Sequence, residues 1–260
     1  MRFFDYNYAF KTFGGTFSAS SNITAATYAF DELVYTRWSS VGENSDATAS
    51  YVERNFGAIR TFTSIFLREH NFKTPIAKYW DGAAWQLITG VVIQNSTDLA
   101  HSYLKFPSIS TLAIRIYNSP TLVANAEKMV NEIMVFDEIG ALVIPSADID
   151  PKRVKTQINH ELDNAKYMKL NRGTRWEITL KFKAHIGLND INLLRTLATR
   201  DAEFYLWIND NSEGDMSYLF EPFMFKDIYK LSIDKGDNPG YYKNMWFSGM
   251  DNQFKLVEVV

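Results

Sequence analysis

Short runs in which apolar and polar residues alternate at every second position constrain this chain more than any other feature. Ala58–Arg68 (AIRTFTSIFLR) has this period, and Arg175–Ile186 (RWEITLKFKAHI) has it again. A two-residue period puts alternate side chains on opposite faces of a strand, so that one face can pack on a core. Aromatic residues, which are enriched in strands, make up 15% of the chain. The sequence therefore predicts an all-β fold.

A β-hairpin is the clearest local signal. The strand-like runs Thr74–Trp80 and Trp85–Thr89 are separated by Asp81–Ala84 (DGAA). Gly82 accepts the positive φ that a tight turn requires, so the pair predicts two adjacent antiparallel strands. Further strands are predicted at Ser110–Asn118, Asn131–Ile139, Ala202–Asp210, Tyr218–Asp234, Tyr241–Met250 and Gln253–Val260.

Helical signals are few. Ser21–Phe30 is predicted to form a short helix or an extended turn, and Asn189–Arg200 gives the better helical pattern. Asn189 can cap that helix by accepting a backbone N–H bond. Its apolar positions recur three residues apart: Ile191, Leu194 and Leu197.

The domain boundary is predicted at Ile144–Lys152 (IPSADIDPK), which holds two prolines together with small and acidic residues. It divides the chain into residues 1–145, a larger β-sandwich, and residues 151–260, a smaller assembly domain. The second domain is predicted to be an antiparallel sandwich or barrel with one inserted helix.

Composition excludes several classes of protein. The formal net charge is -3, and no strongly basic patch indicates a nucleic-acid partner. There is no cysteine, so disulfides, thiolate zinc sites and cysteine nucleophiles are excluded. No apolar run is long enough to predict a membrane span, and the N-terminal MRFFDYNYAF is not typical of a signal peptide.

Several motifs then follow one another in a characteristic order. They are AFDELVYTRWSS (Ala29–Ser40), an alternating strand, YWDGAAWQLI (Tyr79–Ile88), LAIRIYN (Leu112–Asn118) and NEIMVF (Asn131–Phe136). Together they resemble the discoidin-like, or galactose-binding-like, domain over roughly Thr16–Ile139. The resemblance implies a β-sandwich of jelly-roll type. Ser64–Trp85 is similar, more narrowly, to discoidin-like domains of phage tail and other virion proteins.

The resemblance also implies a structural calcium site, at Asp31, Thr36 and Glu132. Calcium requires six to eight oxygen ligands. This chain has Glu32 and Leu33 where sugar-binding members often have Gly-Asp, which weakens the match. The alternative is that Asp31 accepts backbone N–H bonds within a turn.

Aromatic side chains supply the candidate ligand platforms. Trp38 and Trp85 are predicted to pack in the core, because large rings inside such motifs usually lie between sheets. Tyr35, Phe72 and Trp80 are candidate sugar platforms by position, with packing as the alternative for each.

His70 and Asn71 complete the set of candidate ligand-binding residues. A histidine can act as a base near neutral pH, but no nucleophile accompanies this one. The alternative is a structural corner, in which both side chains bond to nearby backbone. Neither residue therefore predicts an enzyme.

The function predicted from these patterns is that of a non-enzymatic structural component of a phage virion, in the tail or baseplate. Its partners would be other virion subunits in a homo- or hetero-oligomer, and its location the virion, assembled in the host cytoplasm. The alternative is a carbohydrate-binding module for host-surface glycans. A glycosidase or esterase would require a pocket with a pKa-shifted carboxylate or a nucleophile–base pair, and the sequence indicates neither.

Overall fold

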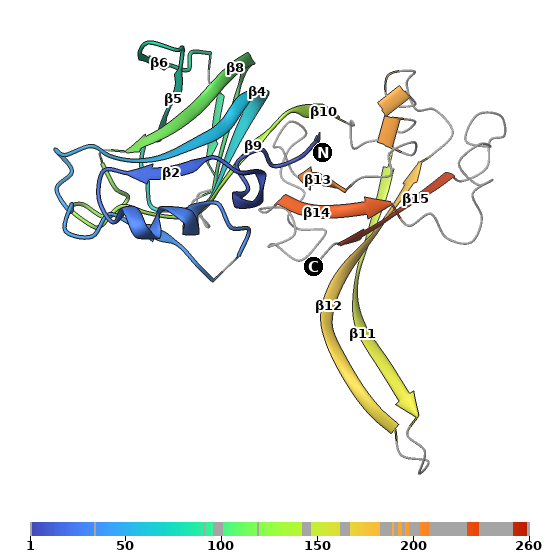
Figure 1. The fold of residues 1–260 in the computed structure, drawn as a ribbon. Helices are drawn as coiled ribbons and strands as arrows, with labels where there is room; N and C mark the ends of the chain where they lie inside the picture. The colour runs from blue at the N-terminus through green and yellow to red at the C-terminus, as the bar shows by residue number, and fades with distance from the viewer. Residues whose placement is uncertain are drawn as a thin grey trace. The chain divides into compact units, whose positions relative to one another are not determined.

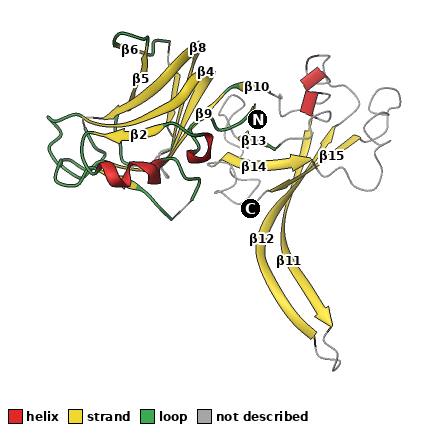
Figure 2. Cartoon of the chain, in the orientation of Figure 1, coloured by secondary structure: helices red, strands yellow, loops and turns green. Residues whose placement is uncertain are grey.

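The computed structural model describes residues 2–33, 35–90, 92–95, 101–118, 120–141, 147–161, 167–182, 189, 192–193, 196–197, 203–207, 228–233 and 252–258. These residues form β-strands in two sheets with short helical segments (Figures 1 and 2), which confirms the predicted all-β class. The chain divides into two compact units. The sandwich unit contains the described residues from Phe4 to Glu138, and the second unit contains Arg2–Phe3 and the described residues from Ile139 onward.

The sandwich unit is built on an eight-stranded sheet with the order β3-β9-β4-β8-β5-β6, in which β2 also pairs with β4 and β7 with β8. The strands are β2 (Thr16–Ala19), β3 (Trp38–Ser39), β4 (Ser50–His70), β5 (Ile76–Trp80), β6 (Trp85–Leu87), β7 (Val92–Asn95), β8 (Ser102–Asn118) and β9 (Met129–Phe136).

Two long strands fold this sheet over on itself. β4 and β8 pair antiparallel along most of their length, with a register shift between Asn55 and Arg60. Gly57 lies in that shift with φ 73°. The first half of β4 pairs with β2, and the second half pairs with β9. Residues from both halves meet in one hydrophobic core, so the two halves face each other as the layers of the predicted β-sandwich: Val52, Phe56, Ile65, Leu67, Leu104, Ile114, Ile116, Ile133 and Val135.

Two short 3-10 helices lie before β3: η1 (Lys11–Phe13), which buries none of its residues, and η2 (Ile23–Ala29), which contributes Ala26 and Ala29 to this core. The second confirms the helical alternative for Ser21–Phe30. Trp38 is 1% exposed and its indole Nε1 donates to the Ser21 carbonyl at 3.2 Å, which confirms its predicted place in the core.

The second unit carries the other sheet, of seven strands in the order β10-β1-β13-β14-β15-β12-β11. The strands are β1 (Arg2–Phe4), β10 (Glu138–Ala141), β11 (Ala147–Glu161), β12 (Tyr167–Phe182), β13 (Phe204–Trp207), β14 (Ile228–Ile233) and β15 (Asn252–Glu258). The pairs β11–β12, β12–β15, β14–β15 and β13–β14 are antiparallel.

Within the predicted boundary at Ile144–Lys152, the described residues 147–152 lie in β11. Pro151 pairs there with Ile178. β11 is the last strand of the sheet, and an edge strand tolerates proline because its outer N–H groups have no partner to lose. The domain limits 1–145 and 151–260 themselves stay a prediction.

The predicted helix Asn189–Arg200 is helical at each of its described residues, and Leu197 is completely buried there. Of the strand predicted at Tyr218–Asp234, the described part is β14. Tyr241–Met250 lies outside the described residues. Among those that are described, no helix has the length and apolar character needed to cross a membrane.

Candidate functional site

One surface of the sandwich unit combines aromatic and charged side chains. From Tyr51 to Phe56 on β4, the even-numbered residues are buried and the odd-numbered ones are partly exposed. On β8, Arg115 and Tyr117 are partly exposed between buried neighbours. This alternation gives the surface one outward side, which we call the outer face: Tyr51, Glu53, Asn55, Ile76, Lys78, Trp80, Trp85, Leu87, Ala113, Arg115 and Tyr117.

Strand register arranges the outer face in rows. Tyr51, Tyr117 and Ile76 lie opposite one another in the first row. The second row holds Glu53, Arg115, Lys78 and Leu87. Asn55 lies opposite Ala113, and Trp80 opposite Trp85, in the third. Because all of these residues sit on paired strands, their spacing is fixed by the backbone ladder.

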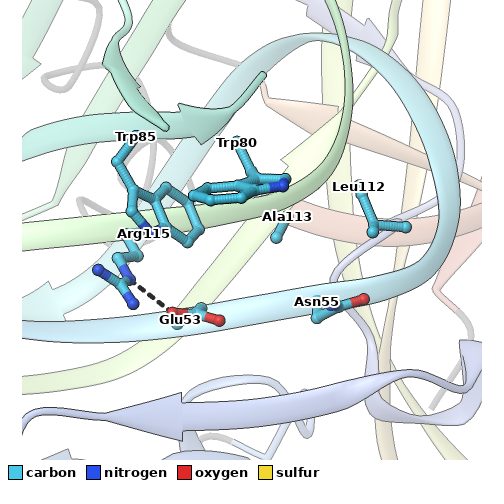
Figure 3. Close-up of a pocket in the computed structure, with 7 residues that line it drawn as sticks. All are labelled: Glu53, Asn55, Trp80, Trp85, Leu112, Ala113 and Arg115. Atoms are coloured by element: carbon cyan, nitrogen blue, oxygen red, sulfur yellow. Dashed lines mark hydrogen bonds and ion pairs between the residues drawn. The ribbon is translucent and has the colours of Figure 1, made fainter. Parts of the chain in front are cut away.

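A pocket of about 230 Å³ opens on the outer face (Figure 3). Its lining residues are Glu53, Asn55, Trp80, Trp85, Leu112, Ala113 and Arg115. The rings of Trp80 and Trp85 stand beside each other, with centroids 5.5 Å apart and planes at 59°. Ala113 is 3% exposed, so a small residue on the strand underneath leaves room for the two indoles.

The hairpin turn between β5 and β6 holds the two tryptophans in place. Gly82 has φ 105°, and the Asp81 N–H donates to the Ala84 carbonyl, as the DGAA motif predicts. The Asp81 carboxylate accepts the N–H groups of Ala84 and Ala83 at 2.7 and 2.8 Å and an amide N–H of Gln86 at 2.6 Å. These bonds lower the pKa of Asp81, so the carboxylate that braces the turn is ionised at neutral pH.

Arg115 contacts residues in all three rows of the outer face. Its Nε donates to Glu53 at 2.5 Å and its Nη1 donates to the Tyr117 hydroxyl at 3.1 Å. Its guanidinium lies 4.3 Å from the Tyr51 ring centre and 4.2 Å from that of Trp85. Partial burial lowers the pKa of Arg115, but the bonds to Glu53 and Tyr117 outweigh it and leave the pKa above its ordinary value. Arg115 is therefore a fixed cation between two aromatic pairs.

The arrangement is suited to binding a ring that has one apolar face and polar edges. Aromatic walls contact the C–H face of such a ring, and a few placed polar groups fix its orientation. Asn55 uses its Oδ1 to accept the Gly57 N–H at 2.9 Å, which leaves its NH₂ group as a donor. Glu53 is the one carboxylate in the pocket lining, and it is paired with Arg115.

Of the ligand platforms predicted from sequence, Trp80 lies in the pocket. The core position predicted for Trp85 is wrong: the ring is only partly buried and contacts Trp80 and Arg115. The physical reason is register, because Trp85 pairs directly with outward-facing Trp80 and therefore shares its side of the sheet.

His70, Asn71 and Phe72 lie together at the end of β4, away from the pocket lining. His70 is 4% exposed, its Nδ1 accepts the Phe72 N–H at 3.0 Å, and its Nε2 lies 2.7 Å from the Ser102 hydroxyl. Asn71 accepts the Met129 N–H through Oδ1 at 2.8 Å. These bonds match the structural-corner alternative, and a ligand role for the three residues stays a prediction.

Tyr35 is 80% exposed and does not line the pocket. It belongs to the loop that contains Asp31 and Thr36. It is the most exposed of the large apolar side chains that the structure describes. Its role as a ligand platform stays a prediction. Because it lies outside the pocket, it can serve as a control for the aromatic residues of the outer face.

Asp31, Thr36 and Glu132 do come together around that loop. The Thr36 hydroxyl donates to Asp31 Oδ1 at 2.8 Å, the Leu33 N–H donates to the same oxygen at 3.1 Å, and Glu132 Oε2 accepts the Glu32 N–H at 2.8 Å. Burial raises the pKa of Glu132 well above its ordinary value, although the charge of Arg68 opposes this.

As they lie, these groups do not fit calcium, which needs six to eight oxygens. Asp31 Oδ1 already accepts protein donors, and the raised pKa favours a neutral Glu132. Within the part of the chain that the structure describes, no group of three or more His, Cys, Asp or Glu side chains could hold a metal ion. The geometry therefore gives the calcium site no support, and the site rests on the sequence resemblance alone.

Sequence reasoning did not identify Glu53, Asn55 or Arg115 as site residues. The signal that could have found them is the period of their strands, which puts these polar residues on the side opposite the apolar ones. Register was also needed, because residues far apart in sequence become neighbours only once β4 is paired with β8.

No protein-family model and no curated protein matches the chain. Solved structures do resemble it. Chitosan-binding module 1 of a chitosanase/glucanase from Paenibacillus sp. IK-5 is 19% identical, with a TM-score of 0.40, over 50% of this chain and 98% of that one. The family 32 carbohydrate-binding module of NanJ from C. perfringens, solved with galactose, is 20% identical, with a TM-score of 0.40, over 47% and 93%. CpGH89CBM32-5 from Clostridium perfringens, solved with GalNAc-β-1,3-galactose, is 15% identical, with a TM-score of 0.39, over 46% and 94%.

Proposed function

We propose that this chain is a carbohydrate-binding protein whose outer face holds the sugar. The observation that carries the proposal is the pocket walled by Trp80 and Trp85, with Glu53, Asn55 and Arg115 at its polar edge. A sugar ring presents C–H groups on one face and hydroxyls around its edge, and the pocket offers a partner for each. The proposal rests on these contacts and does not depend on the solved structures of similar fold.

Binding without catalysis is part of the proposal. Glycoside hydrolysis generally uses two carboxylates on either side of the scissile bond. Among the described residues that line the pocket, Glu53 is the one acid, and Arg115 is bonded to it at 2.5 Å. A single carboxylate that is already bonded to a guanidinium does not supply the pair of acids that this reaction uses.

A glycan array, followed by calorimetric titration of the best ligand, tests the proposal. We expect Trp85→Ala and Trp80→Ala each to weaken binding by at least about tenfold, because each removes one aromatic wall. Tyr35→Ala is the matched control, since it removes an exposed ring that lies outside the pocket. If Tyr35→Ala abolished binding and Trp85→Ala did not, the site would lie in the loop around Asp31 instead. Failure to bind any glycan would contradict the proposal.

A structural role in a phage virion, in the tail or baseplate, is a second proposal and is compatible with the first. The observation that favours it is the β-ribbon of the second unit. β15 pairs with β12 over Glu177–Phe182, while Tyr167–Trp176 pairs with β11 alone among the described strands. A two-stranded ribbon is marginally stable by itself, and a neighbouring subunit could add a strand to it.

The location in a virion and the tail-subunit partners belong to this second proposal. Light scattering on the purified chain tests its homo-oligomeric form, which predicts a mass that is a multiple of 29.9 kDa. A monomer at all concentrations would contradict self-assembly. Co-purification with other subunits of one particle would then be the test of a hetero-oligomer.

A further inference from the structure

We infer that the sugar bound on the outer face is a linear acidic polysaccharide, whose uronate carboxylate lies beside Lys78 while its rings contact the aromatic pairs. This inference rests on the proposed carbohydrate-binding function and specifies the class of its ligand. It is carried by the charges on the outer face and by the spacing of the rows.

The second row holds more positive than negative charge. Lys78 lies directly opposite Arg115 on the neighbouring strand, and like charges in opposite positions destabilise an antiparallel pair. Glu53 compensates Arg115 through the bond of 2.5 Å. Lys78 Nζ instead lies 4.6 Å from the centre of the Tyr117 ring, and among the described residues no carboxylate pairs with it. One acid thus faces two bases, and an anionic ligand group would relieve the repulsion.

The surroundings of Lys78 favour a sugar carboxylate over a polyphosphate. Aromatic pairs lie on both sides of the cation: Tyr51 with Tyr117, whose ring centroids are 5.4 Å apart, and Trp80 with Trp85 at 5.5 Å. The whole chain carries a formal net charge of -3, which does not attract a polyanion such as nucleic acid over long range. Lys78 is a single positive charge between aromatic pairs, and this suits a saccharide in which one carboxylate is flanked by sugar rings.

The length of the site follows from strand geometry. Ala113, Arg115 and Tyr117 mark the three rows along β8. Each residue of an antiparallel strand rises about 3.4 Å, so the outer rows, four residues apart, are separated by about 14 Å, enough for roughly three sugar rings. The two aromatic pairs would contact rings at the ends, and the central ring would carry the carboxylate toward Lys78.

The test uses oligosaccharides of two to six residues from polygalacturonate, hyaluronan and alginate, each beside its carboxyl-reduced neutral counterpart. Titration calorimetry compares the chain with its Lys78→Gln, Lys78→Arg and Trp85→Ala variants. Lys73→Gln is the matched control, because Lys73 is an exposed lysine outside the outer face. We expect at least one acidic series to bind about tenfold more tightly than its reduced form, with affinity rising up to about three residues.

The variants separate this inference from the proposed function. Lys78→Gln should remove most of the preference for the acidic form, Lys78→Arg should restore it, and Lys73→Gln should leave it unchanged. If acidic and reduced sugars bind equally, and both are lost in Trp85→Ala, the inference is overturned while the proposed function stands. A preference that survives in Lys78→Gln also overturns it. If no sugar from the series or from a broad glycan array binds, both fail.

Discussion

The two halves of β4 contrast with each other. In the first half, Tyr51–Asn55, buried and partly exposed side chains alternate. In the second half, Ser64–Arg68, all five consecutive residues are buried. The same strand therefore has one face on the core and one open face in its first half, and two covered faces in its second.

Aromatic contacts accompany the burial of the second half. Phe66 of β4 lies 5.5 Å from the His101 ring, centroid to centroid, and Phe136 of the neighbouring strand β9 stacks on Phe4 at 4.9 Å. The comparison suggests a division of roles within β4. Ser64–Arg68, which is buried on both faces, anchors the strand in the fold, while Tyr51–Asn55 keeps an outer face that a ligand can reach. Binding groups held on paired strands keep their geometry better than groups on loops.

The largest expected effect is on the free energy of unfolding, and it comes from a substitution in the buried second half of β4. Phe66→Ala should lower the free energy of unfolding by about 3–5 kcal/mol, because it removes a buried ring and leaves a cavity. Ile59→Ala is the control on the same strand: Ile59 is 70% exposed, and we expect a change within about 0.5 kcal/mol. Urea unfolding of both variants measures this. Similar losses in the two would show that the covered half is not the anchor.

A second prediction concerns Gly15, which precedes β2, the strand that pairs with the first half of β4. A Cβ on Gly15 would lie 2.0 Å from the Asn55 carbonyl oxygen, and Gly15 has φ 81°. Gly15→Ala should therefore destabilise the unit by about 2–5 kcal/mol through overlap and strained backbone. Gly14 has φ 77° but open space around it, so Gly14→Ala should cost only the conformational part, about 1 kcal/mol.

Measuring sugar binding by the same two glycine variants extends this second prediction. Gly15 leads into β2, whose Thr16 pairs with Asn55 of the pocket lining. Gly15→Ala should weaken sugar binding as well as stability, whereas Gly14→Ala should affect stability alone. Equal thermal midpoints for the two variants would contradict the assigned overlap.

The comparison of halves also explains what the sequence could predict. The run AIRTFTSIFLR correctly indicated a strand, and DGAA correctly indicated the hairpin that positions Trp80. The sequence could not indicate that β4 begins at Ser50 and bends near Gly57, because the bend depends on pairing with β8, which follows it by more than thirty residues. The boundary predicted at Ile144–Lys152 relied on its two prolines, but Pro151 lies within β11, where the edge position of the strand tolerates it.

For the site, periodicity could indicate which side chains face outward but not which of them become neighbours. Arg115 meets Glu53 across 62 positions of sequence. The sequence predicts a core position for Trp85 because large rings inside such motifs usually lie between sheets, and only its pairing with Trp80 places it on the outer face.

The third prediction concerns the pH dependence of folding stability that arises from His70, the last residue of β4. Burial, with a smaller contribution from nearby His101, lowers the pKa of His70 from 6.5 to about 3. His70 Nδ1 accepts the Phe72 N–H, so Nε2 carries the ring proton and donates to the Ser102 hydroxyl. Below pH 6.5 the unfolded chain binds a proton that the folded chain does not. Stability is therefore lost as pH falls from 6.5 toward 3.

Between pH 7 and pH 5 this coupling should cost about 2 kcal/mol, at about 1.4 kcal/mol for each pH unit below 6.5. Chemical unfolding at several pH values, compared between the parent chain and His70→Gln, isolates the histidine because the carboxylates are common to both. The variant should be less stable at pH 7 but should show the shallower decline. Parallel declines would mean that His70 remains able to take a proton in the folded state.

The smallest expected effect concerns calcium at the loop Asp31–Thr36, which Glu132 of β9 ties to the covered half through the Glu32 N–H. Because one oxygen of Asp31 and one of Glu132 already accept protein donors, and burial raises the pKa of Glu132 well above its ordinary value, the loop should not need the ion. The thermal midpoint should differ by less than about 1 °C between calcium and chelator, since a ligand stabilises only by its binding to the folded state. A rise of several degrees in calcium, absent in Asp31→Asn, would establish the site that the sequence resemblance implies. The outer face should bind sugar to the same extent in either case, because no residue of this loop is among those that line the pocket.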